Sequence, residues 1–124
     1  MANKIACCIA YNGVFFTFEF DSKLPIPIGK RFVEMYLSVG IDKIKHILDT
    51  ILDGTSNSSE FPKFMQDASI NFSHEYSNNK YMYLMNFNNM KFLFYENHNE
   101  IGGTHLASLN RFTVENMDSS YRLD

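Results

Sequence analysis

The sequence has no tryptophan, no cluster of basic residues and no long apolar segment. No apolar run approaches the roughly 20 residues that a membrane-spanning helix needs, so we expect no contact with a membrane. The stretch IACCIA near the start is too short for a signal peptide and alternates into a hairpin pattern. The net charge of -3 disfavours a protein that binds DNA through its phosphates. These absences predict a cytoplasmic protein.

Cysteine is scarce, and its only occurrences, Cys7 and Cys8, are adjacent. Neighbours on a strand point to opposite faces, so the two thiols are not expected to pair with each other. We expect them to stay reduced and to pack in the core. The histidines are His46, His74, His98 and His105. None of them is spaced like a zinc ligand from a helix, so the sequence predicts no metal site.

Motifs of catalysis are also missing. The chain has no Gly-x-Ser-x-Gly elbow, no glycine-rich phosphate loop and no His-Glu-x-x-His. Its carboxylates are scattered, and Glu19, Glu75 and Glu96 are most simply placed on a solvated sheet face. The sequence therefore predicts a protein that is not an enzyme and needs no cofactor.

The 124 residues suit a single domain, residues 1–124, with an ordinary globular share of hydrophobic residues, 45%. Asn12-Gly13 is a strong turn signal for a hairpin of Lys4–Tyr11 and Val14–Phe20. Helical spacing of apolar residues predicts helices at Ile28–Val39 and Ile41–Leu52, after a connector that holds Pro25 and Pro27. The expected later strands are Ser69–Tyr76, Lys80–Phe87, Met90–Asn97 and Thr104–Val114. The expected turns between them are Ser77–Asn79, Asn88-Asn89 and His98–Gly103.

This order predicts an α+β fold with an N-terminal β-hairpin, two helices and then a four-stranded antiparallel meander. The helices are expected to pack on one face of the sheet. The hairpin KYMYLMNFNNMKFLFYENHNE is apolar on both faces, and two helices cover only one face. We therefore expect the second face to meet another copy of the chain in a homo-oligomer, most simply a dimer.

Aromatic and arginine side chains make a ligand site the leading functional expectation. Aromatic residues make up 15% of the chain, and their rings offer flat faces for a nucleobase. Arginine offers a planar fork for phosphate. The arginines are Arg31, Arg111 and Arg122, two of them close to the end of the chain. Asn97 and Asn110 offer amide groups for a ribose or a base edge.

By element order, the chain resembles the phage anti-Thoeris proteins of the first-described type. The matching segments are the hairpin IACCIAYNGVFFTFEF, the helices IGKRFVEMYLSVG and IDKIKHILDTILDG, and a strand and tail that carry arginines, NRFTVENMDSSYRLD. Members of that family are not enzymes. They bind the cyclic ADP-ribose isomers that bacterial TIR-domain proteins make, and some also take up cyclic oligonucleotides. They assemble from dimers, up to hexamers.

The resemblance implies an anti-defence sponge in the host bacterial cytoplasm, with an aromatic ring on adenine, an amide, and arginines near phosphates. The positions that match those roles are Phe87, Asn97, Arg111 and Arg122. The alternative is a protein-interaction module, such as an immunity protein or an inhibitor of a defence enzyme. Such a module would present an exposed aromatic face to a protein partner.

Overall fold

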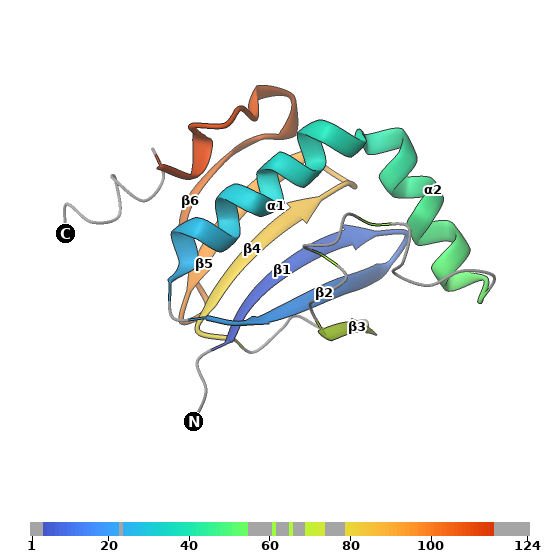
Figure 1. The fold of residues 1–124 in the computed structure, drawn as a ribbon, viewed down its shortest axis with the longest axis horizontal. Helices are drawn as coiled ribbons and strands as arrows, with labels where there is room; N and C mark the ends of the chain where they lie inside the picture. The colour runs from blue at the N-terminus through green and yellow to red at the C-terminus, as the bar shows by residue number, and fades with distance from the viewer. Residues whose placement is uncertain are drawn as a thin grey trace.

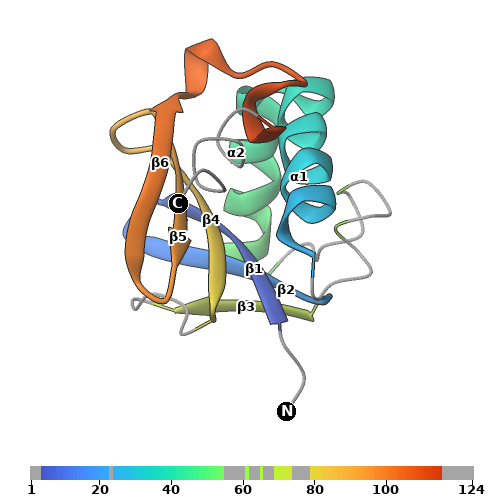
Figure 2. The ribbon, with the colours of Figure 1, turned by 90° about the vertical axis from the view of Figure 1, so that its left-hand side faces the viewer.

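The computed structural model describes residues 4–22, 24–54, 61, 65, 69–73 and 79–115. These residues form an α+β fold in which a six-stranded sheet carries two helices on one face (Figures 1 and 2). The elements in chain order are β1 Lys4–Tyr11, β2 Val14–Asp21, α1 Pro25–Val39, α2 Ile41–Leu52, β3 Ser69–Ser73, β4 Tyr81–Asn86, β5 Lys91–Glu96 and β6 Asn99–His105. The short 3-10 helix η2, Leu106–Ser108, follows β6.

The N-terminal hairpin is confirmed. Asn12 and Gly13 both take positive φ, 54° and 77°, as a type I′ turn requires. β1 then pairs with β2 in register from Lys4 opposite Asp21 to Tyr11 opposite Val14.

The sheet is mixed, whereas the sequence predicted a purely antiparallel meander. The strand order is β3-β2-β1-β4-β5-β6, and β4 runs parallel to β1. β3 pairs with β2 instead of β4, so only β4, β5 and β6 form a meander. A parallel pair needs a long connection, and the helices and β3 lie between β1 and β4 in the chain. The residues of the predicted Ser77–Asn79 turn lie mostly outside the described residues.

Helix α1 begins at Pro25, three residues before the predicted start. Proline lacks an N–H, but the first-turn N–H groups of a helix have no intrahelical partner, so Pro25 and Pro27 fit there. Gly40, with φ 88°, ends α1 through its N–H bond to the Tyr36 carbonyl at 3.0 Å. The Gly40 carbonyl accepts a hydrogen bond from the Ile44 N–H, so α2 starts at the next residue.

The helices cover the first face of the sheet, which holds the larger core. Stacked rings of Tyr83, Phe92 and Phe94 lie beneath α1, and the Tyr83 centroid is 5.9 Å from that of Phe92 and 4.7 Å from that of Phe94. The Tyr83 hydroxyl donates to the Pro25 carbonyl at 2.9 Å. This confirms that one face of the aromatic hairpin packs on the helices.

The second face has a smaller core of its own. Its buried members are Ala6, Cys8, Ala10, Met82 and Leu84, and Phe15, Leu93 and Tyr95 pack at its margin. Ala6 and Cys8 have no exposed surface within one chain. The apolar pattern of this face therefore needs no second copy to exclude water at these positions. An oligomer remains a proposal, but the face that motivated it no longer supports it.

We predict that Gly29→Ala destabilises the fold, although alanine is the better helix former by about 0.5–1 kcal/mol. A Cβ at Gly29 would lie 2.3 Å from Cζ of Tyr83, so the ring or the helix must move. Overpacking of this kind costs roughly 1–3 kcal/mol of unfolding free energy, to be measured by urea denaturation. In a Tyr83→Leu background the ring is gone, and the penalty should disappear. A Gly29→Ala protein as stable as the wild type would refute the contact.

Candidate binding surface

A tight turn after β6 presents an arginine and a phenylalanine to solvent. The Asn110 side-chain oxygen accepts the N–H of Phe112 at 2.8 Å, and the Asn110 N–H donates to Oγ1 of Thr113 at 2.9 Å. Between these bonds Arg111 is exposed and Phe112 is 50% exposed. Cζ of Arg111 lies 4.8 Å from the centroid of the Phe112 ring. We call Arg111 and Phe112 the Arg-Phe pair.

The turn is held to the body of the protein on both sides of this pair. Leu109 precedes it and Val114 follows it, and both are buried in the main core. Nζ of Lys30 on α1 donates to Oε1 of Glu115 at 2.5 Å. Both charged side chains are more than a third exposed, so water screens the ion pair and the apolar anchors contribute more. The backbone of the turn is therefore fixed while the two side chains stay accessible.

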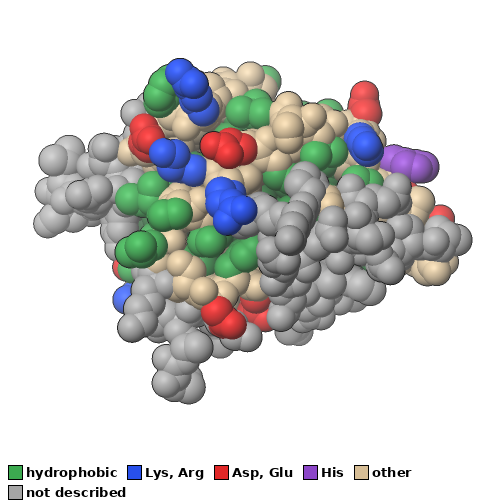
Figure 3. Space-filling view, viewed as in Figure 1, with side chains coloured by type: hydrophobic (Ala, Val, Ile, Leu, Met, Phe, Trp, Pro, Cys, Tyr) green, Lys and Arg blue, Asp and Glu red, His purple; other side chains and the backbone are tan. Residues whose placement is uncertain are grey.

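The face seen in Figure 3 is not uniformly charged. Basic and acidic side chains are interspersed over the region where α1 lies in Figure 1. On α1 itself, Lys30 and Arg31 are followed by Glu34. Among the described residues on this face, the charges do not form the continuous basic stripe that a nucleic-acid backbone requires.

The four residues predicted for the site do not come together within one chain. Phe87 is buried at the far end of β4, with its ring centroid 6.2 Å from those of Tyr11 and Tyr36. Its N–H donates to the Ala10 carbonyl at 2.9 Å. A ring in this position holds the sheet to the helices and offers no free face to a base.

Asn97 lies at the opposite end of the same hairpin. It takes φ 51° in the turn between β5 and β6, and its N–H donates to the Lys80 carbonyl at 2.8 Å. The length of β4 separates it from Phe87, about 20 Å for strand geometry. Its left-handed backbone explains the choice of asparagine without a ligand.

Arg111 lies on the turn described above, so the predicted strand Thr104–Val114 is wrong beyond His105. The Asn110 and Thr113 side chains bond to nearby backbone groups and compete with strand pairing. The predicted turn His98–Gly103 is wrong as well, because a two-residue turn at Asn97 and His98 leads directly into β6. Arg122 lies outside the described residues.

The cysteines are confirmed as core residues. Burial raises the pKa of Cys7 well above its ordinary value, and it raises the pKa of Cys8 to about 12. Oγ1 of Thr17 donates to Sγ of Cys8 at 3.5 Å, which lowers that pKa only in part. Both thiols are thus protonated at neutral pH and are poor nucleophiles.

One polar contact was not anticipated from the sequence. The Tyr11 hydroxyl donates to Oδ2 of Asp49 at 3.2 Å and so ties the end of β1 to α2. Burial raises the pKa of Tyr11, and the bond to Asp49 raises it further. The sequence carried only a weak signal for this contact, a tyrosine next to a turn and an acid on a helix.

Within the described ranges, no three His, Cys, Asp or Glu side chains group as a metal site would need. The helices in those ranges include none with the length and apolar character to span a membrane. No protein-family model, curated protein or solved structure matches this chain.

We predict that neither cysteine reacts with a thiol reagent in the native protein at about pH 8, where an ordinary exposed thiol with a pKa near 8.5 reacts readily. Both should react once urea unfolds the chain. Mass spectrometry after timed alkylation measures each product. Rapid native labelling of either residue would contradict the burial seen here.

Proposed function

We propose that the protein is a non-catalytic binding protein that sequesters a cyclic nucleotide-derived signal, a cyclic ADP-ribose isomer. It would act as a homo-oligomer in the host bacterial cytoplasm and keep the signal away from an anti-phage defence effector of the Thoeris type. The element order supports this proposal through the family resemblance. The single structural observation behind it is the exposed Arg-Phe pair on its fixed turn.

The pair offers the two groups that such a ligand needs. A guanidinium binds phosphate oxygens through parallel, charge-assisted hydrogen bonds. An aromatic face stacks on adenine, at roughly 1–3 kcal/mol per base. In this proposal Phe112 takes the role that the family resemblance gave to Phe87, because Phe112 is accessible.

A sponge requires tight binding without turnover, and the described residues fit that requirement. The thiols are buried and protonated, so neither is a ready nucleophile. A single turn provides one wall of a site, so we propose that a second copy of the chain supplies the opposite wall.

We predict that a cyclic ADP-ribose isomer binds the wild-type protein and that Arg111→Ala weakens binding by roughly tenfold to a hundredfold. This is the loss expected for one charge-assisted contact, about 1.5–3 kcal/mol. Phe112→Ala should weaken it similarly through lost stacking. Isothermal titration calorimetry measures both affinities.

Lys43→Ala is the matched control, because it removes an exposed cation from α2, at the other end of the molecule from the turn (Figure 1). It should leave the affinity unchanged. No binding of any cyclic ADP-ribose isomer, cyclic dinucleotide or cyclic trinucleotide to the wild type would refute the proposed function.

The second candidate function is a protein-interaction module, such as an inhibitor of a defence enzyme. It is favoured by the exposure of Leu24 and Leu37 on or next to α1, together with Phe112. Purification from infected cells separates the two functions. The chain has seven Tyr and no Trp, so a bound adenine raises its absorbance near 260 nm clearly. A stoichiometric protein partner without such absorbance favours the module.

A further inference from the structure

Strand β6 is an edge of the sheet with a self-complementary sequence. Among the described strands it has a neighbour on one side only, β5. An edge strand presents unpaired N–H and C=O groups that accept another strand. We propose that β6 pairs with β6 of a second copy, antiparallel and with Gly103 at the twofold axis. This surface between copies does not depend on the proposed ligand.

The direction of the outward backbone groups of β6 follows from one hydrogen bond at its end. The Leu106 N–H donates to the Met90 carbonyl at 2.8 Å, so the groups of Leu106 point toward β5. In a strand the N–H and C=O of one residue share a side, and that side alternates along the chain. The backbone groups of His105 and Gly103 therefore point outward, to the open edge.

The same reasoning places Glu100 at the open edge. Asn97 and His98 form a two-residue turn, so Glu96 and Asn99 close the hairpin as its bonded pair. The next residue, Glu100, then points its backbone groups outward. In two antiparallel copies centred on Gly103, Glu100 of each copy pairs with His105 of the other copy, and Gly103 pairs with Gly103 of the other copy. These three pairs provide about six backbone hydrogen bonds between the chains.

A β-bulge in β6 places the side chains of Glu100 and His105 on the same face of the strand, as this pairing requires. In the pairing of β5 with β6, Tyr95 lies opposite Glu100 and Phe94 lies opposite Gly102. Ile101 of β6 therefore has no partner and is the extra residue of the bulge. Without it, Glu100 and His105 would project from opposite faces of the strand. With it, both share the second face, since their partners Tyr95 and Lys91 do.

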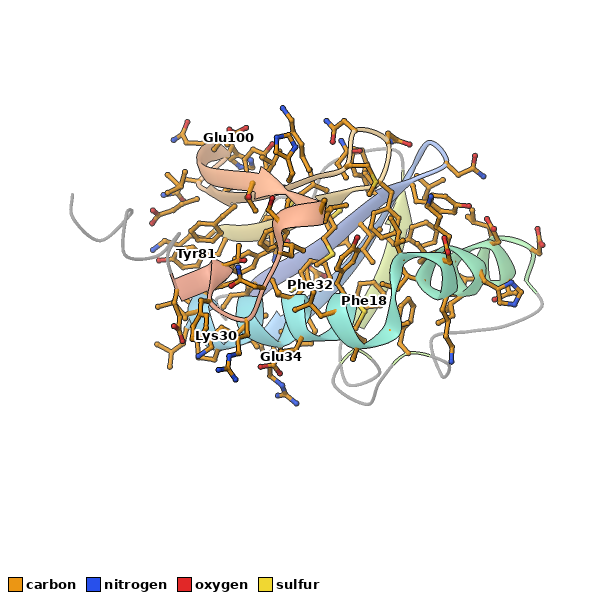
Figure 4. The ribbon with its side chains drawn as sticks, turned by 90° about the horizontal axis from the view of Figure 1, so that it is seen from above. Phe18, Lys30, Phe32, Glu34, Tyr81 and Glu100 are labelled. Atoms are coloured by element: carbon orange, nitrogen blue, oxygen red, sulfur yellow. The ribbon has the colours of Figure 1, made fainter. Side chains whose placement is uncertain are left out.

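Charge and size are complementary in the proposed pair. The carboxylate of Glu100 would lie opposite the imidazole of His105, which donates a hydrogen bond, and Lys91 lies on the other side of that imidazole. Both Glu100 and His105 are exposed. Figure 4 shows Glu100 on the far side of the molecule from Lys30 and Glu34 of α1, so the helices do not obstruct it.

Glycine at the axis fits the close approach of two backbones. In one chain the Leu93 side chain already lies over Gly103, where an added Cβ would come 2.5 Å from Cδ2 of Leu93. Pairing about Gly103 would leave only glycine backbone between the two Leu93 side chains. Their apolar surface would then be continuous across the axis.

The first test is His105→Pro. His105 has φ -80°, close to the value that proline fixes, and its N–H makes no bond to β5 in this ladder. The variant should keep its far-UV circular dichroism and lose the outward donor. We expect it to halve the mass of the wild-type assembly in sedimentation equilibrium, or to raise the dissociation constant at least about tenfold.

The second test swaps the charges and holds even if the proline variant fails to fold. Glu100→Lys and His105→Glu should each weaken self-association, and the double variant should restore it. A wild type that stays monomeric at all concentrations would overturn the proposal. So would single variants that assemble as the wild type does.

Calorimetric titration of the wild type and of the monomeric variants with cyclic ADP-ribose isomers tests this proposal separately from the proposed function. Wild-type assembly through β6 without any binding of cyclic ADP-ribose isomers would refute only the function. Ligand binding by a wild type that does not assemble through β6 would refute only the pairing.

Discussion

The central position of β1 is the constraint on which the rest of the fold depends. β1 has β2 on one side and β4 on the other, and both of its faces are buried. A strand in this position must be apolar throughout, and the run IACCIA meets that need. The parallel pairing with β4 follows from filling the second side of β1, and it places the whole meander of β4, β5 and β6 beyond it.

Local signals in the sequence predicted the elements whose causes are local. Asn12-Gly13 predicted the hairpin because positive φ belongs to those residues themselves, and the apolar stripe of α2 predicted its buried face. The partner of each later strand was not predictable in this way. The position of β3 beside β2 and of β4 beside β1 depends on long-range burial, which strand propensity does not encode.

The errors near the C-terminus have a different origin. Gly102-Gly103 signals a turn in most contexts, yet here Gly103 lies in a strand beneath the Leu93 side chain. Farther on, Asn110 and Thr113 replace strand pairing with side-chain bonds to the backbone. The sequence shows this pattern as an asparagine and a threonine three residues apart. That spacing could have predicted the turn that presents Arg111 in place of a strand.

The aromatic richness of the chain explains its core better than it explains a ligand site. Tyr83, Phe92 and Phe94 stack under α1, and Phe87 closes the end of the sheet against Tyr11. Rings buried in this way cannot also take up a base. Phe112 is the aromatic residue that the described chain leaves exposed, and the guanidinium beside it is of the type that suits phosphate. The proposed nucleotide binding therefore does not depend on the overall aromatic content. It depends on Phe112, the aromatic ring that is exposed among the described residues.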